Sequence, residues 1–185
     1  STGKPIILST GMCSLEEVKN SVNSITESNN DKLILMHCVS NYPSNIDELN
    51  LKVISTMKQE FQIPVGFSDH TIGLTSTLTS VAMGANIIER HFKDERNTPS
   101  SDDVHALTKN EFSELLSSIK NIQKSFGTGE KLPTESEMKN RQTNRVSIVA
   151  ITNISKGTKI TIDMIDVRRP GSGIQPKFFD EVIGM

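Results

Sequence analysis

The chain has 185 residues, 35% of them hydrophobic, which is enough for one sizeable core and a second small module. A formal charge of −2 gives no electrostatic reason to expect nucleic acid or an anionic membrane as partner. No apolar run approaches the roughly 20 residues that a membrane span needs, and the first residues lack the apolar core of a signal peptide. We therefore expect a cytoplasmic protein.

Hydrophobic runs alternate with amphipathic segments over the first two thirds of the chain. Continuous apolar runs typical of buried parallel strands occupy residues 5–9, 33–39, 65–68 and 85–92. Capping-box patterns begin helices at Ser14 and Thr108, and apolar periodicity indicates further helices over 50–61 and 74–84. We expect the outer helices 50–61 and 108–126 to bury Leu51, Ile54, Leu115 and Ile119.

Four consecutive βα units are compatible with either a (β/α)8 barrel or a doubly wound sheet. No G-x-G-x-x-G pattern follows any of the four strands, which argues against a dinucleotide-binding sheet. A barrel needs eight units and usually about 250 residues. We therefore predict an α/β fold in which residues 1–126 are the C-terminal half of a (β/α)8 TIM barrel that begins in mid-domain.

The composition changes at Gly127. Residues 127–144 are polar and interrupted by Gly and Pro, which predicts a linker. Short β-like pieces at 147–151 and 159–162 predict a small β-rich module over residues 145–185. About forty residues are at the low end of what can fold alone, so we expect this module to be incomplete.

Two consecutive predicted strands each end in a histidine, His70 and His91. Successive strands of a βαβ unit are usually neighbours about 4.8 Å apart, so the two imidazoles are expected to face each other. Side chains alternate along a strand, so Ser68 shares a face with His70 and Glu89 shares a face with His91. One face of the sheet therefore gathers a serine, two histidines and a carboxylate.

This constellation favours an open divalent metal site over ordinary hydrogen-bonded histidines. Two histidine ligands are too few for a closed zinc site and leave positions for water and substrate. Four roles remain open for Glu89: general base, acceptor for a sugar hydroxyl, partner of a histidine, or a salt-bridged lining residue. By the same alternation, Asp69 and Arg90 point to the opposite face.

Polar residues follow other predicted strands. Ser9 and Ser40 supply hydroxyls that could hold a phosphate at the top of a barrel, although ordinary turn chemistry explains them too. Asp102 lies in a polar loop, where solvated acidic pairs are usual. Arg169 precedes Pro-Gly and could bind an anion, against the alternative of a solvated surface charge.

Four segments carry a resemblance in combination: 4–12 (KPIILSTGM), 37–43 (HCVSNYP), 66–71 (GFSDHT) and 88–92 (IERHF). Together they resemble the N-acetylneuraminate (sialic acid) synthase family. Beyond the predicted linker, residues 169–173 (RPGSG) resemble the start of that family's antifreeze-like (SAF) domain. The resemblance covers nearly the whole chain.

The resemblance implies a cytoplasmic, metal-dependent transferase. Such an enzyme condenses phosphoenolpyruvate with N-acetylmannosamine, or a related N-acetylated amino sugar, to a nonulosonic acid and releases phosphate. His70 and His91 would hold the metal, with manganese expected and magnesium or cobalt as alternatives, and with Glu89 they would form the catalytic set. The family also implies a domain-swapped homodimer.

The resemblance also assigns residues to the substrates: Ser9, Ser40 and Ser68 line the phosphoenolpyruvate site, Tyr42, Glu89 and Asp102 lie near the sugar, and Arg169 reaches the partner subunit's barrel. The family usually has Gly-Pro before the aspartate, whereas Ser100 and Ser101 precede Asp102 here. Two alternatives are a pyruvate-dependent metal aldolase on a similar barrel and a non-catalytic sugar-binding fragment. Without the preceding half-barrel, we expect this chain alone to be inactive.

Overall fold

The computed structural model describes residues 3–94 and 100–185. The chain forms two compact units, Ser1–Gly127 and Thr128–Met185, and each is considered by itself. Among the described residues, no helix combines the length and apolar character needed to cross a membrane.

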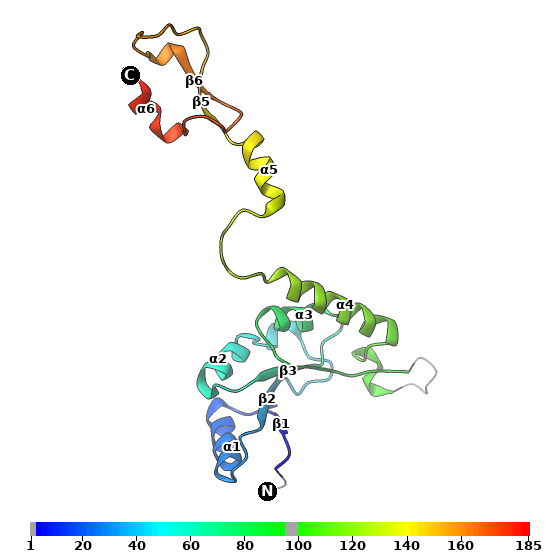
Figure 1. Ribbon diagram of the computed structural model, residues 1–185. Coiled ribbons are helices and arrows are strands. Elements are labelled where there is room, and N and C mark those ends of the chain that lie inside the picture. The colour runs from blue at the N-terminus through cyan, green and yellow to red at the C-terminus, as the bar shows by residue number, and fades with distance from the viewer. Residues whose placement is uncertain (1–2, 95–99) are drawn as a thin grey trace. The chain divides into compact units, whose positions relative to one another are not determined.

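The first unit is a parallel sheet whose strands alternate with helices (Figure 1). Its elements are β1 (Ile6–Ser9), α1 (Leu15–Glu27), β2 (Leu33–Cys38), α2 (Lys52–Phe61), β3 (Val65–Asp69), α3 (Thr75–Ala82), β4 (Ile88–Arg90) and α4 (Lys109–Ser125). The strand order is β1-β2-β3-β4, and all three pairings are parallel. Each strand pairs with the next one in sequence, as in a (β/α)8 barrel, and the order does not reverse as it does in a doubly wound fold. Which half of a barrel these strands represent stays a prediction.

The core of this unit lies between the sheet and the helices α1 and α2. Its buried side chains come from alternate positions of β2 and β3, from the apolar faces of the two helices and from the turn before α2: Val18, Leu33, Leu35, Leu49, Ile54, Met57, Val65 and Phe67. The two predicted capping boxes, Ser14 with Glu17 and Thr108 with Glu111, are confirmed. Both helices therefore begin where the sequence places them.

Two details of the first unit differ from the prediction. The fourth strand was expected over residues 85–92, but β4 covers only Ile88–Arg90, and Phe92 joins Leu107 through an isolated bridge. Of the side chains predicted to be buried, Ile54 and Leu115 are buried, whereas Leu51 and Ile119 are only half-buried. Apolar periodicity thus identifies the buried face of each helix more reliably than its edges.

Leu115 and Leu116 form a matched pair on α4, because they are adjacent and chemically identical. Leu115 is 1% exposed and Leu116 is 48% exposed. We expect Leu115→Ala to lower the free energy of unfolding by about 2–5 kcal/mol through lost burial and a residual cavity. Leu116→Ala is expected to cost less than about 1 kcal/mol. Urea unfolding followed by fluorescence of the single tyrosine, Tyr42, measures both, and equal losses would contradict this packing.

His37 gives the stability a pH dependence. It lies against the core, where its Nε2 is 2.7 Å from the carbonyl oxygen of Leu49. Burial lowers the pKa of His37, although the bond to Leu49 opposes this effect. A lowered pKa means that the unfolded chain binds the proton first as the pH falls, so the stabilisation is complete above about pH 6.5 and declines below it.

Burial also lowers the pKa values of His70 and His105, so all three histidines act in the same direction. We expect the urea midpoint to fall between about pH 7.5 and about pH 5.5, and to fall less in His37→Gln. Hydrogen bonds from Thr108 lower the pKa of Glu111, so its stabilisation is complete above about pH 4.5 and stays constant over this range. A midpoint that does not change over this range would refute the assignment.

The second unit contains α5 (Glu135–Asn144), β5 (Ser147–Ala150), β6 (Ile165–Arg168) and α6 (Phe179–Val182). Strands β5 and β6 form an antiparallel pair. The strand predicted at 159–162 is wrong, because Ile160 bonds only to the C-terminal residues Gly184 and Met185, and a 3-10 turn begins at Ile162. Two hydrogen bonds at a single residue do not make residues 159–162 a β-strand.

The predicted linker, 127–144, contains the helix α5. No residue of α5 is buried, so the helix lacks the apolar stripe from which the other helices were predicted. The sequence signal that identifies it is the capping box of Thr134 and Glu137, whose carboxylate accepts a hydrogen bond of 2.9 Å from the threonine hydroxyl.

Candidate functional site

The four strands of the first unit end around one cleft of about 570 Å³. Its lining includes seven residues that were predicted as site residues: Ser9, Ser40, Tyr42, Ser68, His70, Glu89 and His91. It also includes Cys38 and Glu17, which the sequence did not indicate as site residues. A volume of this size suits a small ligand.

The turn after β1 is held against the end of β2. The hydroxyl of Thr10 donates to the carbonyl of Met36 at 3.0 Å, and the amide of Gly11 lies 3.2 Å from the sulfur of Cys38. Gly11 has a φ of 41°, and a Cβ at this position would lie 3.1 Å from the hydroxyl oxygen of Ser40. Glycine therefore allows the turn to approach Ser40 closely.

Ser68 and Glu89 are direct neighbours across β3 and β4. The Ser68 hydroxyl donates a hydrogen bond of 2.6 Å to Oε1 of Glu89. This contact holds the carboxylate at the wall of the cleft, while the rest of the Glu89 side chain stays accessible. The predicted sharing of one face by these residues is confirmed.

Asp69 and Arg90 occupy the other face, as the alternation predicts. Their side chains form an ion pair of 2.7 Å, and both are 0% exposed. Asp69 also accepts hydrogen bonds from the hydroxyl of Thr77 and the amide of Thr71. The Arg90 guanidinium donates to the carbonyls of Thr71 at 2.9 Å and His105 at 3.1 Å. The pair thus fixes the chain segments that follow β3 and precede α4.

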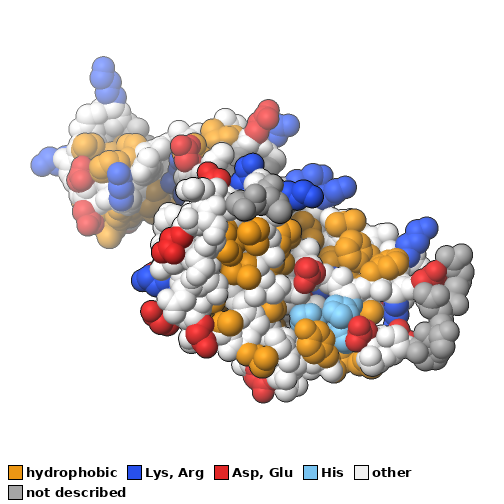
Figure 2. Space-filling view, turned by 90° about the horizontal axis from the view of Figure 1, so that it is seen from below, with side chains coloured by type: hydrophobic (Ala, Val, Ile, Leu, Met, Phe, Trp, Pro, Cys, Tyr) orange, Lys and Arg blue, Asp and Glu red, His pale blue; other side chains and the backbone are white. Residues whose placement is uncertain are grey.

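The predicted meeting of two imidazoles is confirmed. The ring centroids of His70 and His91 are 5.2 Å apart in an edge-to-face arrangement, and the Tyr42 ring lies 4.3 Å from His70. Figure 2 shows histidine side chains gathered in one patch, with hydrophobic and acidic side chains beside them. Burial lowers the pKa of His70, and the neighbouring His91 lowers it further. A neutral imidazole is the form that binds a metal.

Asp102 does not line the cleft, but it contacts a residue that does. One of its carboxylate oxygens lies 3.0 Å from Nδ1 of His91. A carboxylate that orients a histidine is a common feature of metal sites. The two imidazoles, one of them oriented by a carboxylate, therefore fit a divalent ion. The resemblance, by contrast, places Asp102 near the sugar.

His105 was not predicted. It is 2% exposed, and its ring centroid lies 4.6 Å from that of His91. It follows the polar loop rather than ending a strand, so the strand-end pattern that identified His70 and His91 could not find it.

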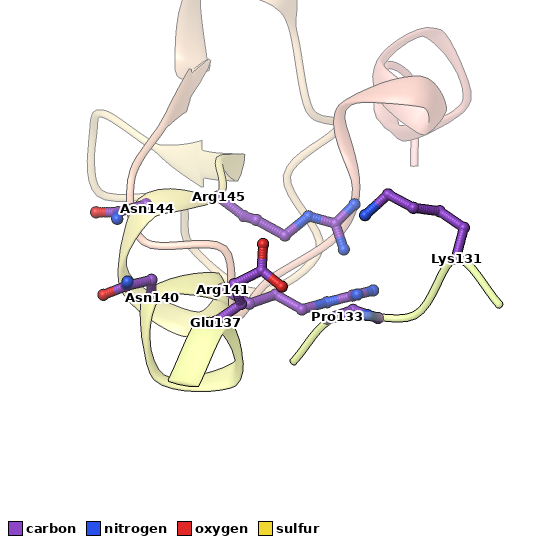
Figure 3. A pocket seen from close by; sticks show the side chains of 7 residues that line it. All are labelled: Lys131, Pro133, Glu137, Asn140, Arg141, Asn144 and Arg145. Carbon is purple, nitrogen blue, oxygen red and sulfur yellow. The ribbon is translucent and has the colours of Figure 1, made fainter. Parts of the chain in front are cut away.

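Arg169 belongs to the second unit, where it follows β6 and is exposed. That unit has its own cleft of about 340 Å³, and Figure 3 shows Lys131, Arg141 and Arg145 extending into it beside Glu137. All of these side chains are exposed. The cleft of the first unit, which is lined by the buried His70 and the half-buried His91, is therefore the candidate site.

Comparisons with known proteins show the family to which the chain belongs. Residues 1–131 match the NeuB family, and residues 145–185 match the SAF domain. N,N'-diacetyllegionaminic acid synthase from Legionella pneumophila is 38% identical over 184 residues, covering 97% of this chain and 52% of the relative. Human N-acetylneuraminate-9-phosphate synthase is 32% identical over 167 residues, covering 90% of this chain and 46% of the relative.

A solved structure is also similar. The sialic acid synthetase of Leptospira borgpetersenii, crystallised with citrate, matches with a TM-score of 0.67 and 35% identity, covering 75% of this chain and 48% of that chain. The chain thus spans about half the length of the proteins it matches. Because the family match covers more than half of the chain, this protein belongs to the NeuB family.

Proposed function

We propose that this chain contributes the cleft of a sialic-acid-type synthase. The reaction joins the methylene carbon of phosphoenolpyruvate to the aldehyde carbon of an N-acetylated amino sugar. Water adds to the former enol carbon, the bond from that carbon to the phosphate oxygen breaks, and a nonulosonic acid and inorganic phosphate are released. The relatives named above, which make legionaminic and neuraminic acids, support this class of product.

The observation that carries the proposal is the grouping of three serines, two histidines and Glu89 around one cleft. Ser9 and Ser40 supply hydroxyl donors at the ends of two neighbouring strands, which suits an anionic substrate such as phosphoenolpyruvate. Ser68, whose own proton goes to Glu89, lines the same cleft. Glu89 and Tyr42 supply a carboxylate and a phenol for sugar hydroxyls. Strand ends at the carboxyl edge of a barrel are where such residues act.

His70 and His91 would hold a divalent ion, for which we propose manganese, with magnesium or cobalt as alternatives. When bound, such an ion supplies a Lewis acid for the sugar carbonyl. We propose that Asp102 acts near the sugar, which its 3.0 Å contact with His91 supports. We propose that Arg169 acts from the SAF domain of a partner subunit in a domain-swapped homodimer, where a guanidinium suits an anionic group.

The experiment is an assay of the native protein, isolated from cells that produce this chain. It is incubated with N-acetylmannosamine and either phosphoenolpyruvate or pyruvate. We expect phosphate release in equal amount to nonulosonic acid from phosphoenolpyruvate, and no product from pyruvate. Condensation of pyruvate without phosphate release would instead identify an aldolase. Binding of the sugar without any product would identify a sugar-binding protein.

A further inference from the structure

We propose that His105 is a metal ligand, in a site that it forms with His91 and Asp102. The inference rests on the proposed function, because the site shares His91 with the proposed metal-binding pair of His70 and His91.

The ligand atoms of the three residues are close enough for one ion. One nitrogen from each histidine and one oxygen from Asp102 all lie within 4.8 Å of one another. Metal bonds of about 2.1 Å place two donors of one ion at most about 4.2 Å apart, so only a small contraction is needed. Nδ1 of His91 and a carboxylate oxygen of Asp102 already lie 3.0 Å apart, and an ion bound by both residues would replace this direct contact.

The ring of His105 lacks a partner. Within residues 3–94 and 100–185, neither ring nitrogen of His105 has a hydrogen bond, although both are buried. Buried polar side-chain atoms are nearly always hydrogen-bonded or bound to an ion. Coordination of an ion would give one of these two nitrogens a partner.

The backbone presents Asp102 and His105 together. Residues Ser101–Val104 form a 3-10 turn, and the amide of His105 donates to the carbonyl of Asp102 at 3.1 Å. Side chains three residues apart in a 3-10 turn lie on the same side, so both point toward one position. The carbonyl of His105 is held by Arg90, which is itself fixed by its buried ion pair with Asp69. The position of the third imidazole is therefore determined by rigid elements.

The donor set also affects the choice of ion. Two imidazoles and one carboxylate suit zinc, cobalt, iron or manganese better than magnesium, which prefers oxygen ligands. We therefore infer a site selective for a first-row transition metal over magnesium.

The test is a zinc titration of the purified chain labelled with ¹⁵N at its histidines. We expect the ring nitrogen signals of His91 and His105 to shift at one equivalent of zinc. His37 is an internal control, because its Nε2 bonds to the Leu49 carbonyl, on the face away from the cleft, and its signals should stay unchanged. This measurement needs no substitution, so it does not depend on a variant that folds.

A second measurement uses cobalt absorption with His105→Phe, which keeps the ring volume, and His105→Cys, which keeps a donor atom. Loss of an outer partner of a metal ligand typically weakens metal affinity by about 10–100-fold, so loss of a ligand should raise the cobalt Kd at least about tenfold in His105→Phe. His105→Cys should retain binding with an altered spectrum.

Two results would overturn the inference. Unshifted His105 signals, together with an unchanged cobalt Kd in His105→Phe, would show that His105 is not a metal ligand. The proposed pair of His70 and His91 would not be affected by that result. Absence of any zinc or cobalt binding by the unaltered chain would overturn both this inference and the metal dependence of the proposed function.

Discussion

Replacing Arg90 with methionine is expected to lower the free energy of unfolding by about 3–5 kcal/mol, because it leaves the Asp69 carboxylate buried without its cation. Both side chains are 0% exposed and lie 2.7 Å apart. The substitution also removes the donors to the carbonyls of Thr71 and His105. Methionine keeps much of the side-chain volume, so the loss reflects charge and hydrogen bonding more than a cavity.

The control is Lys19→Met, which removes the cation of an ion pair on the surface of the same unit. Lys19 lies 3.2 Å from Glu60, and the two side chains are 50% and 40% exposed. Solvent screens this pair, so its loss should cost less than about 1 kcal/mol. Urea unfolding followed by Tyr42 fluorescence compares both variants, since the chain has one tyrosine and no tryptophan. Similar costs for the two variants would show that the Asp69–Arg90 pair does not stabilise the fold as argued.

The strand ends of the first unit were predictable because alternation along a strand is a strict geometric rule. Once Ser68 and Glu89 are assigned to neighbouring parallel strands, their positions on the cleft follow, as do those of Asp69 and Arg90 on the other face. The register is also constrained at Gly66, where a Cβ would lie 2.7 Å from the carbonyl oxygen of Ile87. The alternation of side chains and the close packing at Gly66 therefore indicate the same register for β3 and β4.

The loop before α4 was not predictable in the same way. Asp102 and His105 reach His91 through a 3-10 turn and through bonds between segments distant in sequence, and no periodic pattern encodes such contacts. The helix α5 was missed for a different reason, because it buries nothing and periodicity detects only helices with an apolar face. Sequence reasoning succeeded where burial repeats regularly and failed where a single contact decides the structure.

Glu89→Gln is expected to lower kcat/KM of the condensation by at least about a hundredfold, the lower end of what general acid–base groups contribute. Glutamine has the same size and keeps an oxygen that can accept the hydrogen bond from Ser68, which is 2.6 Å in the native chain, so the cleft should keep its shape. Only the charge and the capacity to take up a proton are lost. The measurement is phosphate release by the native protein and by the variant, at varied sugar concentration.

The way in which the loss divides between kcat and KM distinguishes the roles open to Glu89. A fall in kcat with unchanged KM indicates a group that acts in the transition state, whereas a rise in KM alone indicates an acceptor for a sugar hydroxyl. Glu114→Gln, on the exposed surface of α4, is the matched control and should leave both constants unchanged. If Glu89→Gln turns over as fast as this control, Glu89 takes no part in catalysis, and its bond to Ser68 only lines the cleft.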